Sequence, residues 1–169
     1  GMPTRTQQCD LLLCAYASHG DTKHPMLFPA NPEDCFHMTL AAFDLADELQ
    51  TPVFLMSDLD VGMNDWMCKD LEWNNNYKPK RGKVLSADQL EKIEKFYRYY
   101  DSDGDGIPYR SLPGVHPKGS FFTRGSGHNK YGGYTEDGHE YQEVVDRLKV
   151  KWNTARKMMP KPKIKYSKK

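Results

Sequence analysis

The sequence predicts an α/β protein with a parallel sheet, on the strength of three observations in its first sixty residues. Helical patterns and short apolar runs alternate twice, in the order helix, strand, helix, strand, which is typical of a parallel α/β sheet. Residues 26–28 form a short apolar run, and residues 53–56 form a second one with the length expected of a strand buried on both faces. Strong start and stop signals bound the helix between these two runs.

The first predicted helix covers residues 6–17 and ends before a glycine. The second begins after Asn31, because an N-cap residue, a proline at the first position and two acidic residues follow each other there. It runs to about residue 49, and Phe36, Leu40 and Phe43, at i, i+4 and i+7, are its predicted buried face.

The second half of the chain is predicted to contain two further helices. Ser86 and Gln89 form a capping box, and the apolar spacing after it extends a helix to about residue 100. Residues 101–133 are dense in Gly and Pro and predict a long connection. The last helix is expected from about residue 135 or 137 to just before Pro160. Its predicted buried face consists of Tyr141, Val144, Val145, Leu148, Trp152 and Ala155.

With 169 residues the chain is predicted to form one domain, residues 1–159, followed by a basic linker or tail, residues 160–169. No apolar run approaches the length of a membrane span and no signal peptide opens the chain, so we expect a cytoplasmic protein without a membrane partner. The net charge of +1 argues against nucleic acid as a partner, although residues 147–169 carry ten basic residues and no acidic one. The four cysteines lack zinc-ligand spacing and are expected to be reduced thiols.

Three segments carry residues with functional chemistry. Asp101, Asp103 and Asp105, with a glycine after them, match the first half of a calcium loop, but Leu112 stands at position twelve where a bidentate Glu is needed. The loop is therefore a weak calcium candidate, and the alternative is an Asp- and Gly-rich turn. The loop of residues 57–60 follows the second predicted strand, where open α/β sheets place ligands, and the alternative is a solvated loop.

Thr4, Arg5 and Thr6 precede the first predicted helix. An arginine flanked by hydroxyl groups at such a place can receive a carboxylate or a phosphate, and the alternative is a solvated terminal arginine. The sequence shows no nucleophile with a recognisable base partner, so no catalytic residue is assigned.

Five strings of the sequence together resemble one family. They are G-M-P-T-R-T-Q-Q-C-D-L-L at residues 1–12, H-G-D at 19–21, A-F-D-L-A-D-E-L-Q-T-P-V-F-L-M-S-D at 42–58, D-G-D-G-I-P-Y-R-S-L-P-G at 103–114 and F-F-T-R-G-S-G-H at 121–128. The family is the alpha subunit of 2-oxoacid:ferredoxin oxidoreductases, of the 2-oxoglutarate type. The resemblance reaches from the start of the chain to its last predicted helix.

This resemblance implies a three-layer parallel sheet of the thiamin-diphosphate-binding fold, namely the C-terminal part of the pyrimidine-binding domain. It implies an oxidoreductase that decarboxylates a 2-oxo acid such as 2-oxoglutarate or pyruvate on thiamin diphosphate and forms an acyl-coenzyme A. Electrons would pass through iron-sulfur clusters to ferredoxin. In the family, the arginine of the P-T-R-T motif lies at the substrate, which implies that Arg5 binds the 2-oxo acid, with Thr4 and Thr6 beside it.

The sequence also departs from the family pattern. The match begins part-way into the family's domain, and the motifs for the diphosphate, its magnesium ion and the clusters belong to the beta subunit or to other modules. We therefore expect the chain alone to bind no cofactor and to be inactive. We also expect an oligomer, because an incomplete sheet leaves edges and apolar faces uncovered. The alternative is a non-catalytic dimerisation or protein-interaction module derived from the same fold.

Overall fold

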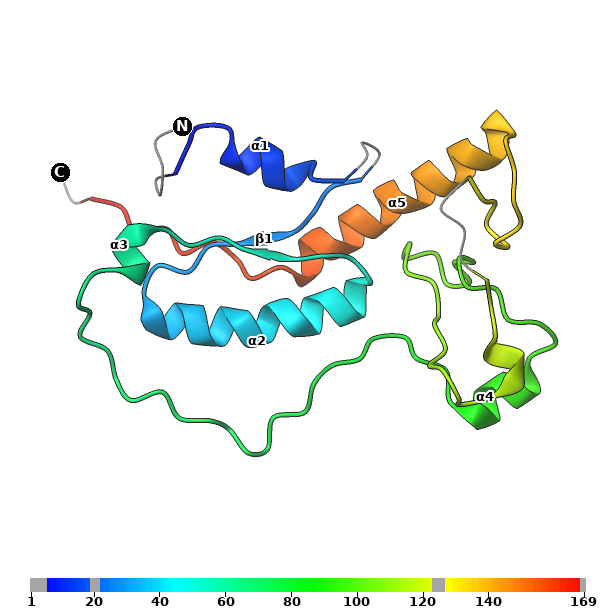
Figure 1. The fold of residues 1–169 in the computed structure, drawn as a ribbon, viewed down its shortest axis with the longest axis horizontal. Helices are drawn as coiled ribbons and strands as arrows, with labels where there is room; N and C mark the ends of the chain where they lie inside the picture. The colour runs from blue at the N-terminus through cyan, green and yellow to red at the C-terminus, as the bar shows by residue number, and fades with distance from the viewer. Residues whose placement is uncertain (1–5, 19–21, 123–126, 168–169) are drawn as a thin grey trace.

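The computed structural model describes residues 6–18, 22–122 and 127–167. In the order of the chain, the elements are α1 (Asp10–Ala15), β1 (Met26–Leu27), α2 (Pro32–Leu49), β2 (Phe54–Leu55), α3 (Leu59–Gly62), α4 (Ala87–Lys92), the 3₁₀ turn η1 (Pro117–Gly119) and α5 (Gly138–Met158). Figure 1 shows α2 below the sheet and α1 above it, with α5 reaching away to one side.

The sheet consists of β1 and β2, which pair in parallel with Met26 opposite Phe54 and Leu27 opposite Leu55. Helix α2 connects the two strands, so the predicted order of helix and strand and the parallel pairing are confirmed. The expectation that residues 53–56 are buried on both faces is wrong, because they are only partly buried. Two short strands, the whole sheet of the described residues, offer too little surface to enclose β2.

Helix α2 has the bounds that its local signals predict. The Asn31 side chain accepts a hydrogen bond from the Asp34 amide at 2.8 Å, and Pro32 occupies the first turn. At the other end Gln50 adopts a left-handed conformation with φ of 50°, and its amide donates to the carbonyl of Ala46.

The core lies between α2, the sheet, the loop before Ile107 and the end of α5. Its buried members are Leu27, Leu45, Leu49, Ile107 and Ala155. The buried face predicted for α2 is wrong at Phe43, which is 71% exposed, and Phe36 and Leu40 are only partly buried. Helix α2 instead turns the neighbouring stripe, which begins at Met38, toward β2 and α5.

Helix α1 is shorter than the predicted 6–17 and has no buried residue, and its leucines are 52% to 65% exposed. The capping box of α4 is confirmed, but the helix ends at Lys92 and not near residue 100. Lys118 donates to the carbonyls of Glu91 and Ile93 at 2.6 and 3.4 Å, so a distant side chain satisfies the last carbonyls of this helix.

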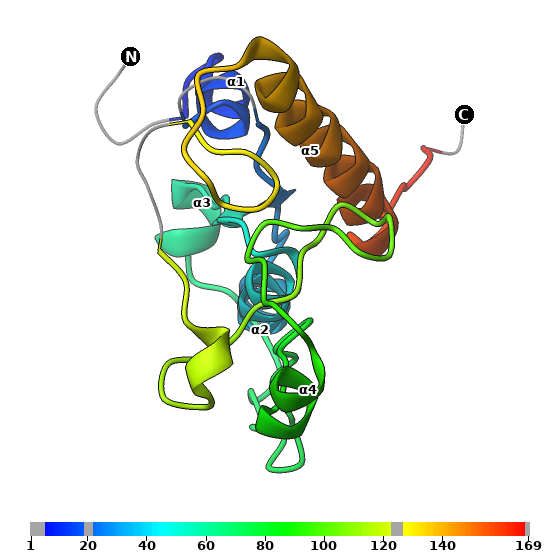
Figure 2. The ribbon, with the colours of Figure 1, turned by 90° about the vertical axis from the view of Figure 1, so that its right-hand side faces the viewer.

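Helix α5 begins after Asp137, whose carboxylate accepts hydrogen bonds from the amides of His139 and Glu140. Of its predicted buried face, Ala155 is buried and Tyr141 is 51% exposed, because the first turns of α5 extend beyond the core (Figures 1 and 2). Residues 160–167 have no regular structure and run back toward α3. Within the described residues, no helix is both long enough and apolar enough to cross a membrane.

Candidate functional site

The carboxyl ends of β1 and β2 lie at one edge of the sheet, next to α3 and to the first turn of α2 (Figure 1). Strand β2 leads directly into α3, whose N-cap Asp58 accepts a hydrogen bond from the Val61 amide at 3.0 Å. The loop of residues 57–60 therefore lies at the predicted edge of the sheet. Open α/β sheets bind ligands at this edge, so it is our candidate functional site.

An open pocket of about 520 Å³ lies at the start of α2. Its lining residues are Asn31, Pro32, Glu33, Trp66, Met67, Cys68 and Lys69. The Trp66 indole donates a hydrogen bond to the Asp60 carbonyl at 2.9 Å and so fixes this segment to α3. Because the pocket combines apolar surface with Glu33 and Lys69, it suits a ligand that has an apolar body and a charged group. Residues 66–69 were not predicted to line a site, although the Trp and Met between polar residues could have indicated one.

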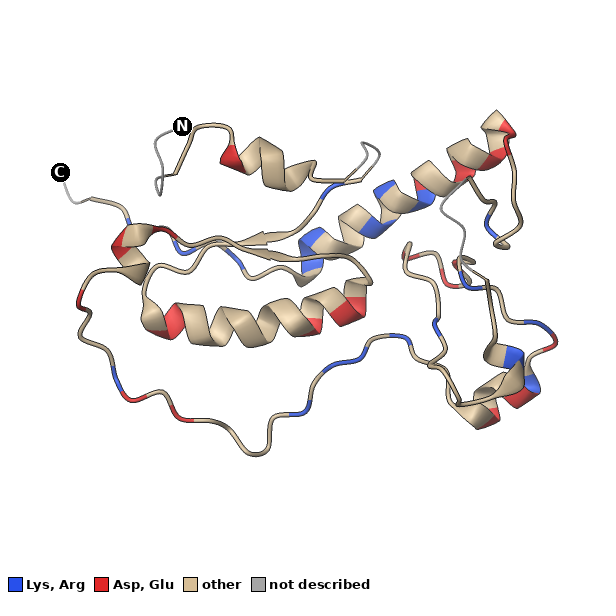
Figure 3. Cartoon of the chain, in the orientation of Figure 1, with Lys and Arg blue, Asp and Glu red and all other residues tan. Residues whose placement is uncertain are grey.

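Asp34, one of two acidic residues in the first turn of α2 (Figure 3), is held in its charged form. The Lys163 ammonium donates to Asp34 at 3.2 Å, and the Ala30 amide donates to the same carboxylate at 3.3 Å. These hydrogen bonds, with that from Lys163 the larger influence, hold the pKa of Asp34 below its usual value. The contact also brings Lys163, in the segment after α5, to the first turn of α2.

The described part of the structure does not show Thr4, Arg5 and Thr6, the residues that the resemblance places at the substrate, together in a site. Thr4 and Arg5 lie outside the described residues, and Thr6 is exposed in an irregular segment before α1. Their role as substrate-binding residues remains a prediction.

A serine and a histidine lie within hydrogen-bond distance of each other, and this pair was not predicted from the sequence. The Ser18 hydroxyl is 3.2 Å from Nε2 of His24, and the His24 ring is 5% exposed and meets the Phe54 ring edge-on. Nδ1 of His24 is buried without a hydrogen-bond partner among the described residues. No described carboxylate orients the ring, so the arrangement lacks the third group of a catalytic triad.

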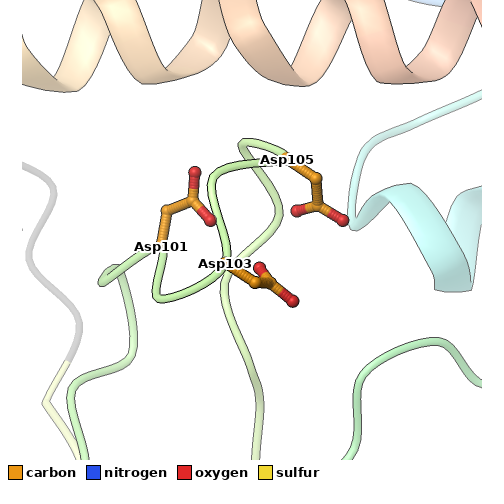
Figure 4. A group of neighbouring side chains, drawn as sticks. All are labelled: Asp101, Asp103 and Asp105. Carbon is orange, nitrogen blue, oxygen red and sulfur yellow. The ribbon is translucent and has the colours of Figure 1, made fainter.

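Asp101, Asp103 and Asp105 converge as the calcium prediction requires, with one oxygen of each within 4.8 Å of the others (Figure 4). However, the cation that two of these carboxylates bind is the ammonium group of a lysine. Nζ of Lys83 lies 2.6 Å from Asp103, 2.7 Å from Asp105 and 3.0 Å from the Ile107 carbonyl. Asp101 accepts the amides of Gly104 and Gly106. We therefore assign the loop the alternative role, an Asp- and Gly-rich structural turn. The ammonium of Lys83 offsets part of its negative charge.

Comparison with known proteins gives the family. The family described as "Pyruvate flavodoxin/ferredoxin oxidoreductase, thiamine diP-bdg" matches residues 1–87, which is more than half of the chain. The chain belongs to this family. The resemblance found in the sequence is thereby confirmed.

Individual relatives agree. The chain is 32% identical over 139 residues to a protein of Aeropyrum pernix named "2-oxoacid:ferredoxin oxidoreductase 2, subunit alpha", an alignment that covers 81% of this chain and 20% of the relative. It is 38% identical over 73 residues to the "2-oxoglutarate oxidoreductase subunit KorA" of Mycobacterium tuberculosis, covering 42% of this chain and 11% of the relative. The chain thus spans at most about a fifth of the length of these relatives.

A solved structure shares the fold. The 2-oxoglutarate:ferredoxin oxidoreductase of Magnetococcus marinus, determined with 2-oxoglutarate, coenzyme A and succinyl-CoA bound, superposes with a TM-score of 0.74. The match covers 95% of this chain and 27% of that protein at 21% identity. The fold is therefore an α/β fold of the kind found in this oxidoreductase.

Proposed function

We propose that the chain acts as part of the alpha subunit of a 2-oxoacid:ferredoxin oxidoreductase, which oxidatively decarboxylates a 2-oxo acid to an acyl-coenzyme A. The family match over residues 1–87 carries this proposal, and the fold similarity over 95% of the chain supports it. In the complete enzyme we expect the two strands to be part of a larger three-layer parallel sheet. The proposed division is a domain of residues 1–159 and a basic tail of residues 160–169, working in the cytoplasm.

The described residues do not fit thiamin diphosphate and its magnesium ion. In the one described group of three carboxylates with a metal-like arrangement, Asp103 and Asp105 already bind the ammonium of Lys83, and Asp101 accepts two backbone amides. A diphosphate with its metal requires carboxylate and amide oxygens that are not engaged in this way. We therefore propose that the beta subunit holds the cofactor and the metal, that iron-sulfur clusters elsewhere in the complex pass electrons to ferredoxin, and that this chain lies on the substrate side.

Arg5 is the residue proposed to bind the substrate carboxylate, with Thr4 and Thr6 beside it. A guanidinium group offers two parallel N–H donors to a carboxylate, which fixes both the position and the orientation of the acid. The chain contributes no assigned catalytic residue, so we expect the isolated chain to be inactive.

The test is turnover in the complete complex. With the beta subunit present, Arg5→Ala is expected to raise KM for the 2-oxo acid by roughly tenfold or more, since a lost charged hydrogen bond costs about 1.5–3 kcal/mol. Arg156→Ala is the matched control, because Arg156 is exposed near the end of α5. An unchanged KM in the Arg5 variant would exclude this substrate role, and 2-oxo acid turnover by the isolated chain would overturn its expected inactivity.

A second candidate function is a non-catalytic dimerisation or protein-interaction module derived from the same fold. The observation that favours it is the exposure of large apolar side chains, among them Leu12 at 65%, Met63 at 75% and Met67 at 102%. Size-exclusion chromatography with light scattering, with and without the beta subunit, separates the two. A stable homo-oligomer that does not bind the beta subunit would favour the interaction module.

A further inference from the structure

A second open pocket lies between α5 and the segment that leads into β1 (Figure 1). Its volume is about 270 Å³, and its lining residues are Thr22, Lys23, Leu148, Lys149, Trp152 and Asn153. It shares no lining residue with the pocket at the start of α2. Because drug-sized ligands occupy larger pockets, this volume suits a molecule with about one ring.

The apolar part of the pocket comes from one face of α5. Leu148 and Trp152 lie four residues apart, so their side chains are neighbours on the helix surface. The Trp152 side chain also packs against the buried core, and this contact fixes its position. A partly buried indole held in this way offers a planar surface on which an aromatic ring can pack.

The opposite wall is fixed by the backbone next to Lys23. The amide of His24 donates a hydrogen bond at 3.1 Å to the carbonyl of Ala15, at the end of α1. His24 and Pro25, which follow Lys23, are both buried. A ligand would therefore meet two walls that are already in place, and binding would cost little conformational entropy.

The rim of the pocket carries a net positive charge. Lys149 is paired with Asp146 at 2.8 Å. Lys23 forms no ion pair in the part of the chain that the structure describes, and its ammonium lies 5.7 Å from the ring centre of Tyr16. Two lysines and one aspartate leave a net charge of +1, which matches a single carboxylate group.

The polar side chains of the pocket have hydrogen-bonding capacity to spare. The Thr22 hydroxyl has only a long contact, 3.4 Å from the carbonyl of Lys23. The exposed Asn153 amide forms no hydrogen bond with the other described residues. Together with the Lys23 ammonium, these groups supply donors for the two oxygens of a carboxylate.

We propose that this pocket binds a small aromatic monocarboxylate. The ring packs on Trp152 and Leu148, and the carboxylate pairs with the Lys23 ammonium at the rim. A ring without a charge leaves the cation without a partner, and a charge without a ring leaves the apolar surface in contact with water. The proposal does not depend on the proposed enzymatic function, which assigns no role to these residues.

The experiment is an NMR titration of the full chain at pH 7, in which the indole N–H signals are followed. The chain has three tryptophans, so Trp66→Phe and Trp73→Phe suffice to assign the signals. Benzoate is the probe, benzyl alcohol supplies the ring without the charge, and acetate supplies the charge without the ring, all at one ionic strength set with chloride. We expect the Trp152 signal to shift and to saturate with benzoate, at concentrations about fivefold or more below those needed with either control compound. Trp73, which contacts Phe36 outside the pocket, is the internal control.

A variant gives the second measurement. Lys23→Met is expected to weaken the affinity for benzoate by about two- to fivefold, because an exposed ion pair contributes a modest free energy. Lys157→Met is the matched control and should leave the affinity unchanged, since Lys157 is exposed at the end of α5 and does not line the pocket.

Four results would overturn the proposal. The first two are no shift of the Trp152 signal with benzoate, and a parallel shift of the Trp73 signal, which would indicate a general effect. The other two are equal affinities for benzoate and benzyl alcohol, and an unchanged affinity in Lys23→Met, because the carboxylate would then not be recognised. If Lys23→Met does not fold, the three compounds tested on the natural chain still decide the question.

Discussion

Lys151 gives the fold a stability that depends on pH. Burial, together with the nearby charges of Arg147 and Arg98, lowers the pKa of Lys151 from 10.5 to about 8. Arg147 in turn faces Asp101, whose carboxylate partly offsets its charge. Below pH 8 the ammonium is charged in both the folded and the unfolded chain, and the fold bears the full cost of burying it. At about 1.36 kcal/mol per unit of pKa, that cost is about 3 kcal/mol.

The perturbation that isolates this effect is Lys151→Met, which keeps the length of the side chain and removes its charge. At pH 7 the free energy of unfolding of the variant is expected to be higher by about 2 kcal/mol. Removing the buried charge adds about 3 kcal/mol, and losing the hydrogen bond to Gln50 subtracts about 1 kcal/mol. For a chain of this size, that corresponds to a Tm higher by about 4–8 °C.

The pH dependence has a definite sign. Between pH 8 and 10.5 the unfolded natural chain binds more protons at this position than the folded chain does, so its stability rises with pH relative to the variant. Urea unfolding of both proteins at pH 7, 8, 9 and 10, in chloride without phosphate and with a reducing agent present, measures the difference. Lys149→Met is the control and should show a difference near zero throughout. A difference between the natural chain and Lys151→Met that stays constant from pH 7 to 10 would refute the reasoning.

Three further substitutions test other contacts by urea unfolding. Gly106→Ala should cost more than about 3 kcal/mol or prevent folding, because φ is +82° there and the added Cβ would overlap the backbone of Lys151; a loss below 1 kcal/mol would contradict the close packing. Lys83→Met should cost about 1.5–3 kcal/mol and make stability responsive to millimolar calcium, whereas the natural chain should not respond; equal responses would mean that the ammonium does not fill the loop. Asn31→Ala should cost about 1 kcal/mol through loss of the cap, and no change would exclude that contribution.

Capping signals in the sequence correctly predicted where two of the helices begin. The bounds of α2 follow from the cap at Asn31, and the start of α4 follows from its capping box. The end of α4 could not be predicted, because two tertiary contacts accompany it. The Lys118 ammonium donates to the carbonyls of Glu91 and Ile93, which lie 27 and 25 residues earlier, and the buried Phe96 packs against Phe121. The period of α2 identified an apolar stripe but not which stripe faces the sheet, and Phe43 is exposed as a result.

The candidate sites show the same limit. The spacing of three aspartates predicted that they converge, but the lysine that pairs with two of them lies about twenty residues earlier in the chain. The pocket at the start of α2 is lined by residues 31–33 and by residues 66–69, two segments that lie far apart in the sequence. No spacing rule connects residues that only the tertiary fold brings together.

The hydrogen bond between Lys151 and Gln50 joins residues that are 101 positions apart, and this distance has a consequence for folding during synthesis. Helix α2 and the two strands leave the ribosome before α5, which is synthesised roughly a hundred residues later. At roughly 5–20 residues per second, about 5–20 seconds pass before α5 is available. During that interval Leu45 and Leu49 remain uncovered by α5, so a chaperone that recognises apolar helices can bind them.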